Sequence, residues 1–218
     1  MNYTEEIKKH LRTELEPSNQ AYRCFNTGGV EVETGEFLYA LVRLMKPTTI
    51  LETGTHKGIS AAYMAGALKD NYRDGAPTGK IDTIEFLEPN YIESGELFQK
   101  LGLELFIVQH MTDAAAFNPS TAQYDIIFLD TEPQTRFAEL VKFYDNLKPG
   151  GFLLIHDLHP HMHQIENAEH GFGWPYGAIP QAMDKITDEK KLIPLHFRTP
   201  RGLTMFYKPG SEDHYYHA

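Results

Sequence analysis

The sequence lacks the features that mark a disulfide-bonded or membrane-embedded protein. Cys24 is the only cysteine among 218 residues, which excludes an internal disulfide and a cysteine-based zinc motif. No apolar run approaches the roughly 20 residues that a membrane-spanning helix needs. The opening stretch MNYTEEIKKHLRTEL also has no apolar signal-peptide core. We therefore expect a soluble, cytoplasmic protein.

Basic residues are scarce as well. Lys and Arg number 20 against 30 Asp and Glu, which gives a formal net charge of -10 at pH 7. A protein that grips a nucleic-acid backbone normally presents a basic face. We therefore expect no nucleic-acid partner.

Two glycine-rich fingerprints are missing. The segment LETGTHKGIS contains Gly54 and Gly58, but it does not have the spacing G-x-G-x-x-G of a dinucleotide site. Gly58 is followed by Ile-Ser rather than Lys-Ser or Lys-Thr, so the segment is not a Walker A loop either. These absences disfavour a nicotinamide-dependent dehydrogenase.

Strand and helix patterns alternate along the chain after a short N-terminal helix and a loop. Strands are expected in TTILETGT, KIDTIEF, LELFIVQH, YDIIFLD and FLLIHD, and a closing hairpin in LIPLHFRT and GLTMFYK. Helices are expected in TGEFLYALVRLMKP with Thr34 as its N-cap, ISAAYMAGALKDNY, PNYIESGELFQKLG, QTRFAELVKFYDNLKPGG and YGAIPQAMDKITDEK. The alternation predicts an α/β fold, a doubly wound, mostly parallel seven-stranded sheet with a terminal antiparallel strand.

Ligands of such sheets bind at the carboxyl ends of the strands. The side chains expected there belong to residues 52–58, Glu85, residues 111–113, Asp130 and residues 156–157. The last pair opens the stretch IHDLHPHMH, which holds four of the chain's 11 histidines. A metal site, a catalytic base and a polar loop are all compatible with this composition.

Four segments in this order and spacing, ILETGTHKGIS, IDTIEFLEPNY, YDIIFLD and LKPGGFLLIHD, resemble the class I S-adenosylmethionine-dependent methyltransferases. Within that class they are most similar to small O-methyltransferases of the catechol and caffeoyl-coenzyme A type. The resemblance implies a Rossmann-like methyltransferase domain over residues 34–208, preceded by a helical and loop extension at 1–33 and followed by a tail at 209–218. We also expect a homodimer. The N-terminal helices either dimerise or line the acceptor pocket, and both alternatives stay open.

The resemblance implies which residues hold the cofactor. Glu52 matches the acid that helps to hold the methionine amine, Ser60 matches a serine that contacts the methionine carboxylate, and Glu85 matches the ribose-binding acid. The adenine would be framed by Met111, Thr112 and Asp113. The remaining residues assigned to the cofactor are Gly54, Thr55, Gly58 and Asp130.

The metal-dependent members have an Asp at the end of the fourth strand and Asp-Asn at the end of the fifth. Here the corresponding residues are Asp130, His156 and Asp157, all of which are able to bind a divalent ion such as Mg²⁺ or Mn²⁺. The lysine base of the catechol-type enzymes is replaced by Pro133.

Candidate bases are Glu132, His159 and His156. His161 and His163 are expected in a solvated loop, and EHGFGWPYG (169–177) in a flap over the acceptor.

Three hypotheses follow. The first is a methyltransferase that acts on a hydroxyl of a small molecule with the aid of a divalent metal. The second is a metal-independent O- or N-methyltransferase in which His156 or His159 takes the proton. The third is a non-catalytic, methyltransferase-like subunit that binds the cofactor or a partner protein.

Overall fold

The structure is a computed structural model that describes residues 1–18, 22–25, 29–119, 121–158, 187–197, 199 and 201–210. Three predictions lie outside the described residues: His159 as a base, residues 161–163 as a loop, and the 169–177 flap. Most of the helix expected at 176–190 and of the tail at 209–218 lies outside them too. None of the described helices is long and apolar enough to cross a membrane.

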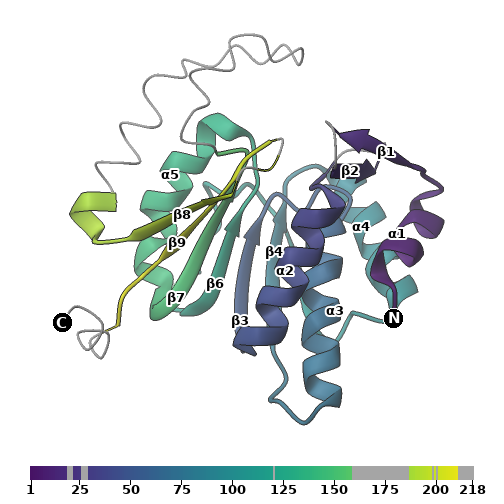
Figure 1. Ribbon diagram of the computed structural model, residues 1–218, viewed down its shortest axis with the longest axis horizontal. Coiled ribbons are helices and arrows are strands. Elements are labelled where there is room, and N and C mark those ends of the chain that lie inside the picture. Colours follow the sequence, from purple (N-terminus) through teal and green to yellow (C-terminus); the bar gives the residue numbers. More distant parts are fainter. Residues whose placement is uncertain are drawn as a thin grey trace.

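A single seven-stranded sheet organises the chain, as the sequence predicted (Figure 1). Its strand order is β5 (Ile107–Met111), β4 (Lys80–Glu85), β3 (Thr49–Thr53), β6 (Tyr124–Leu129), β7 (Leu147–His156), β9 (Leu203–Tyr207) and β8 (Ile193–Phe197). The first five strands are parallel, whereas β9 runs antiparallel to both β7 and β8. The order turns back after β3, and this switch point gathers the ends of β3, β4, β6 and β7 at one edge.

Helices cover both faces of the sheet. They are α1 (Tyr3–Leu11), α2 (Val32–Met45), α3 (Ile59–Arg73), α4 (Glu88–Leu101) and α5 (Pro133–Phe143). Ile50 belongs to a core that also holds residues of α1 to α4, while its neighbour Leu51 belongs to a second core with α5 residues. Successive strand residues point to opposite faces, so an almost wholly apolar strand is what two cores require.

The N-terminal segment differs from the predicted helix plus loop. After α1 the chain forms an antiparallel pair, β1 (Leu15–Ser18) and β2 (Tyr22–Phe25), in which Leu15 lies opposite Phe25. Phe25 is buried, and α1 packs into the same core as α3, where the hydroxyl of Tyr3 donates to the carbonyl of Gly66. The short strands carry little local signal, so their sequence does not predict a hairpin. Tertiary packing stabilises it instead.

Two element boundaries are also corrected. Helix α2 begins at Val32 with Glu31 as its N-cap residue, and Thr34 instead donates its hydroxyl to the Glu31 carboxylate at 2.9 Å. The segment 147–151, expected to end a helix, begins β7 after a 3-10 turn at Tyr144–Asn146. There Gly150 donates its backbone N–H to the carbonyl of Lys208, so strand pairing overrides the helix-ending signal of Pro-Gly-Gly.

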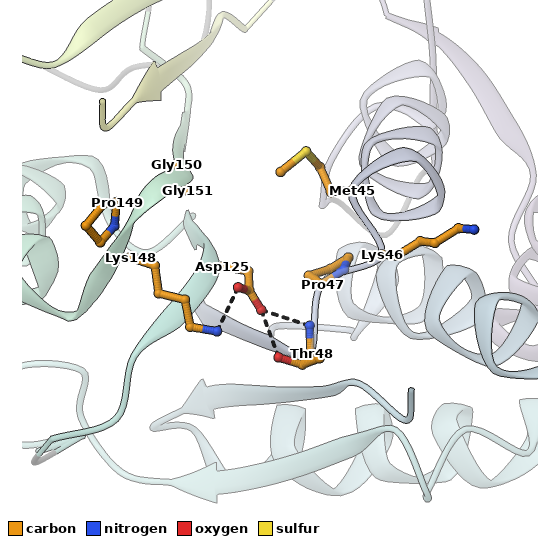
Figure 2. Close-up of a pocket in the computed structure, with 9 residues that line it drawn as sticks. All are labelled: Met45, Lys46, Pro47, Thr48, Asp125, Lys148, Pro149, Gly150 and Gly151. Atoms are coloured by element: carbon orange, nitrogen blue, oxygen red, sulfur yellow. Dashed lines mark hydrogen bonds and ion pairs between the residues drawn. The ribbon is translucent and has the colours of Figure 1, made fainter. Parts of the chain in front are cut away.

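A carboxylate joins the amino ends of three strands (Figure 2). Asp125 Oδ2 accepts hydrogen bonds from the backbone N–H groups of Thr48 and Thr49 at 2.8 and 3.0 Å, and from both hydroxyls at 3.1 Å. Its Oδ1 pairs with Lys148 Nζ at 2.7 Å. Burial alone would raise the pKa of Asp125, but Lys148 and the two N–H donors lower it. This contact fixes the register of β3, β6 and β7, and the carboxyl ends of these strands carry the candidate site.

Candidate active site

The turn after β3 needs glycine at its first position. Gly54 has φ of +83°, and a Cβ placed on it would lie 2.2 Å from the backbone oxygen of Asp130. Its N–H and that of Thr55 both donate to the carbonyl of Ile84 at 3.0 Å. The turn is therefore held between the ends of β4 and β6, and Gly58, with φ of +76°, delivers the chain into α3.

Glu52, near the end of β3, is completely buried. It accepts hydrogen bonds from the hydroxyls of Ser60 at 2.6 Å and Thr83 at 2.5 Å. Burial raises the pKa of Glu52 to about 8, against the effect of the two hydroxyl donors and with a further contribution from Asp130 and Glu85. A buried acid of this kind becomes a strong cation site once a positive group reaches it.

Glu85 ends β4 beside this acid and fixes the surrounding backbone. Its carboxylate accepts the backbone N–H of His56 at 2.7 Å and that of Leu87 at 2.8 Å. Thr112 donates its backbone N–H to the Glu85 carbonyl at 2.9 Å, which places the segment after β5 beside it. The structure thus brings together, along one sheet edge, the predicted cofactor residues of three neighbouring strands.

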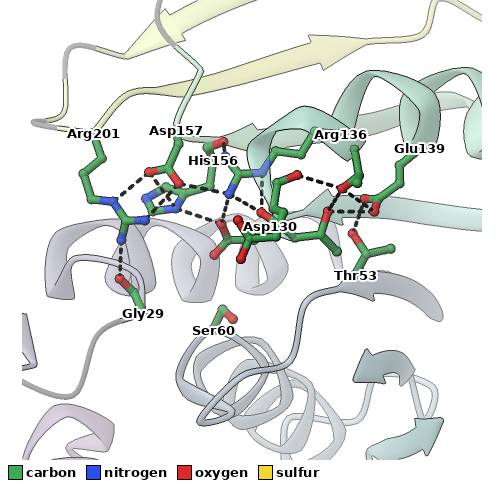
Figure 3. A network of polar contacts seen from close by, with 12 residues as sticks. Gly29, Thr53, Ser60, Asp130, Arg136, Glu139, His156, Asp157 and Arg201 are labelled. Atoms are coloured by element: carbon green, nitrogen blue, oxygen red, sulfur yellow. Dashed lines mark hydrogen bonds and ion pairs between the residues drawn. The ribbon is translucent and has the colours of Figure 1, made fainter. Parts of the chain in front are cut away.

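The predicted triad also comes together, at the ends of β6 and β7 (Figure 3). Asp130, His156 and Asp157 each offer a ligand atom, and these atoms lie within 4.8 Å of one another. His156 is fully buried, with Nδ1 3.0 Å from Asp130 Oδ1 and 3.5 Å from Asp157 Oδ1. Asp157 leaves the strand in the left-handed region at φ of 55°, which turns its side chain back toward the triad.

Glu31 contacts the triad from a distant part of the sequence. Its Oε2 lies 2.9 Å from Nε2 of His156, and neither side chain is exposed. Burial would lower the pKa of His156, but Asp130, Asp157 and Glu31 outweigh it and raise that pKa to about 10. Each ring nitrogen of His156 faces a carboxylate, so in this arrangement neither is open to an acceptor.

Two arginines complete the network. Arg136 Nη2 lies 3.1 Å from Asp130 Oδ1 and 2.9 Å from Asp157 Oδ2. Arg201 Nε lies 2.7 Å from Asp157 Oδ1, its Nη2 donates to Asp157 Oδ2 at 2.8 Å, and its Nη1 donates to the carbonyl of Gly29 at 2.7 Å. Burial opposes ionisation of Asp157, yet His156, Arg136 and Arg201 lower its pKa to about 2.

Sequence reasoning did not identify Glu31, Arg136 or Arg201. Arg136 carried one available signal, because it occupies the position four residues before the buried Leu140 on α5, where an apolar residue is typical. Glu31 and Arg201 carried none, since their partners are 125 and 44 residues away. Glu132, the N-cap residue of α5, is exposed, and its role as a base stays a prediction.

The comparisons with known proteins agree with this arrangement. Residues 51–158 match a family model described as a methyltransferase domain. This chain carries a methyltransferase domain. The match begins in β3 and ends directly after Asp157, so it includes both the turn at Gly54 and the predicted triad.

Relatives and solved structures extend the comparison. Tapetum-specific methyltransferase 1 of Arabidopsis thaliana is 27% identical over 153 residues, which cover 68% of this chain and 61% of that protein. Across the curated relatives, the aligned region spans 56–61% of their length. The methyltransferase PaMTH1 of Podospora anserina, solved with S-adenosylhomocysteine, has a TM-score of 0.69 at 17% identity and covers 95% of this chain and 88% of its own.

The O-methyltransferase TomG of Streptomyces achromogenes, solved with S-adenosylmethionine, has a TM-score of 0.64 at 19% identity. The alignment covers 95% of this chain and 90% of TomG. At these identities the likeness concerns the fold. The resemblance to small methyltransferases is confirmed at that level.

Proposed function

We propose that the protein is an S-adenosylmethionine-dependent O-methyltransferase that acts on a hydroxyl of a small molecule. The observation that carries the proposal is the pair of buried acids Glu52 and Glu85 at the ends of adjacent strands, on either side of the Gly54 turn. Structural neighbours with this fold hold S-adenosylmethionine or S-adenosylhomocysteine. We extend that binding to this chain as part of the proposal.

The chemistry of the cofactor suits these acids. S-adenosylmethionine carries an ammonium and a sulfonium group, and a buried carboxylate such as Glu52 is stabilised as an anion when a cation contacts it. Glu85, already fixed by two backbone donors, keeps free lone pairs for ribose hydroxyls. Methyl transfer then depends mainly on holding the acceptor oxygen in line with the methyl group.

The acceptor would approach the Asp130, His156 and Asp157 end of the same edge. Glu132 and His159 are the proposed alternatives for the residue that takes the hydroxyl proton. The exposure of Glu132 favours it, because a base must come within hydrogen-bond distance of the acceptor. His156 satisfies this requirement only after losing one of its carboxylate contacts.

A divalent metal, which the related enzymes imply, fits this donor set poorly. The three residues are close enough to share an ion, but Arg136 already bridges Asp130 and Asp157, and His156 faces a carboxylate at each ring nitrogen. A metal needs a deprotonated imidazole with a free lone pair. We therefore derive no step of the reaction through a metal, and the second hypothesis, metal-independent transfer, is the better supported alternative.

Calorimetric titration with S-adenosylhomocysteine tests the cofactor part of the proposal. We expect one saturable site per chain, which is weakened in Glu52→Ala and Glu85→Ala and unchanged in the exposed control Glu104→Ala. Absence of binding in the wild-type protein would remove the proposal. Transfer of a labelled methyl group to a panel of phenols, sugars and other hydroxylated small molecules tests the reaction, with amines as the competing acceptor class.

The homodimer stays a prediction. Light scattering coupled to size-exclusion chromatography checks it, with a mass of twice that of the chain as the expected result.

A further inference from the structure

We propose that the guanidinium of Arg136 takes the place of a divalent metal between Asp130 and Asp157, which makes this centre an arginine-held, metal-free site. The proposal departs from the metal dependence that the related enzymes would suggest. It concerns the residues of this chain only, and its central test does not require an active enzyme.

Arg136 already occupies the space between Asp130 and Asp157. Nη2 of Arg136 lies 3.1 Å from Asp130 Oδ1 and 2.9 Å from Asp157 Oδ2, so its charge lies between two of the three residues that could hold a metal (Figure 3). A cation at this point already pairs with one oxygen of each carboxylate. A second cation would have to displace it.

Backbone carbonyl groups hold the Arg136 side chain in this position. Its Nε donates to the carbonyl of Thr131 at 2.9 Å, and its Nη1 donates to the carbonyl of His156. The side chain is only 5% exposed. Moving it away would leave buried carbonyl groups without donors and would bring a charged group out of its hydrogen-bonding site, and both changes are costly.

Asp157 and His156 have further charged partners besides Arg136 and each other. Asp157 is engaged on its outer side as well, because Arg201 lies 2.7 Å from Oδ1 and 2.8 Å from Oδ2. His156 has Asp130 at one ring nitrogen and Glu31 at the other. Each of the three potential ligands therefore already contacts a charged protein group, while Asp157 Oδ1 has an ion-pair partner in Arg201 but no hydrogen bond.

A consequence follows for the acceptor, and it rests on the proposed function. A metal in such a site orients an acceptor by binding two of its oxygens. With arginine in that place, an acceptor needs only one hydroxyl, so adjacent hydroxyls as in a catechol give no advantage. We therefore expect small molecules with a single hydroxyl to be accepted as well as those with adjacent hydroxyls.

The test measures Mn²⁺ binding by electron paramagnetic resonance and calorimetry in three proteins: wild type, Arg136→Met and Arg201→Met. Methionine keeps the apolar length of the side chain and removes its charge. We expect no saturable Mn²⁺ site in the wild type and a saturable Mn²⁺ site in Arg136→Met. Arg201→Met is the matched control, because it also removes an Asp157 partner yet leaves Arg136 between the carboxylates.

Three further measurements make the outcome decisive. Adding Asp130→Asn to Arg136→Met should abolish the new Mn²⁺ site, which assigns it to this centre. Circular dichroism and cooperative urea unfolding establish that each variant is folded. If Arg136→Met does not fold, wild-type metal content and the response to exhaustive chelation decide the matter, with no bound metal and unchanged cofactor binding as the expected result.

Saturable Mn²⁺ binding to the wild type that Asp157→Asn removes would overturn the proposal. So would a folded Arg136→Met variant that binds no Mn²⁺. Failure of S-adenosylhomocysteine to bind the wild type would refute the proposed function instead. The Mn²⁺ results would still test the role of Arg136, because they do not depend on cofactor binding.

Discussion

Replacement of Glu52 by Gln gives the sharpest test of the cofactor site, because the structure predicts opposite effects on stability and binding. Glu52 is fully buried between the hydroxyls of Ser60 and Thr83, and its pKa is raised from 4.5 to about 8. Gln keeps the shape and hydrogen-bonding capacity of the neutral acid but never becomes charged. The difference between the two proteins therefore isolates the ionisation of this one group.

The sign and size follow from linkage. The folded state of the wild type holds the Glu52 proton up to about pH 8, whereas the unfolded chain loses it near pH 4.5. Wild-type stability relative to Glu52→Gln is therefore greatest below pH 4.5, falls as the pH rises to about 8, and then stays constant. Between pH 5 and pH 9 the relative change is about 4 kcal/mol, or roughly 10 °C in melting temperature.

The assay is thermal and urea unfolding of wild type and Glu52→Gln at pH 5, 7 and 9, followed by circular dichroism. Glu104→Gln controls for the loss of one charge at an exposed position. We expect Glu52→Gln to gain stability over the wild type as the pH rises, and to bind S-adenosylhomocysteine more weakly at every pH. Parallel stability curves for the two proteins would refute the argument that burial keeps this acid neutral.

Three other perturbations test separate parts of the molecule. Gly54→Ala places a Cβ 2.2 Å from the Asp130 backbone oxygen, so we expect loss of S-adenosylhomocysteine binding by calorimetry, whereas Gly75→Ala, with open space around it, should bind normally. Glu31→Ala leaves the buried His156 without one partner and should lower the free energy of unfolding by urea by about 3–5 kcal/mol. The control Glu36→Gln, which removes an exposed charge, should not show this loss. Asp125→Ala removes the acceptor shared by Thr48 and Thr49 and should cost about 2 kcal/mol at pH 7. Because the pKa of Asp125 is lowered, this contribution should be full above its ordinary pKa and disappear as the pH falls through the lowered value, and a constant difference down to pH 2 would contradict it.

Local sequence patterns were sufficient for the sheet and for bringing the proposed cofactor residues to one of its edges. The apolar runs around Ile50 and Ile126, separated by amphipathic helices, specify a doubly wound sheet because two cores must be filled from alternate sides. Gly54 and the acids Glu52 and Glu85 could be placed together from the sequence, since the carboxyl ends of parallel strands meet at one edge. The β1–β2 hairpin could not, because its stability comes from burying Phe25 against distant helices.

The sequence by itself determined that Asp130, His156 and Asp157 would lie together, because each lies at the carboxyl end of a predicted strand. Only the tertiary structure decided what surrounds them. Glu31, Arg136 and Arg201 come from the N-cap of α2, the first turns of α5 and the turn before β9, and none has a local pattern that points to the triad. Their charges act over a few ångströms in a buried environment, so their effect depends on distances that no sequence spacing contains.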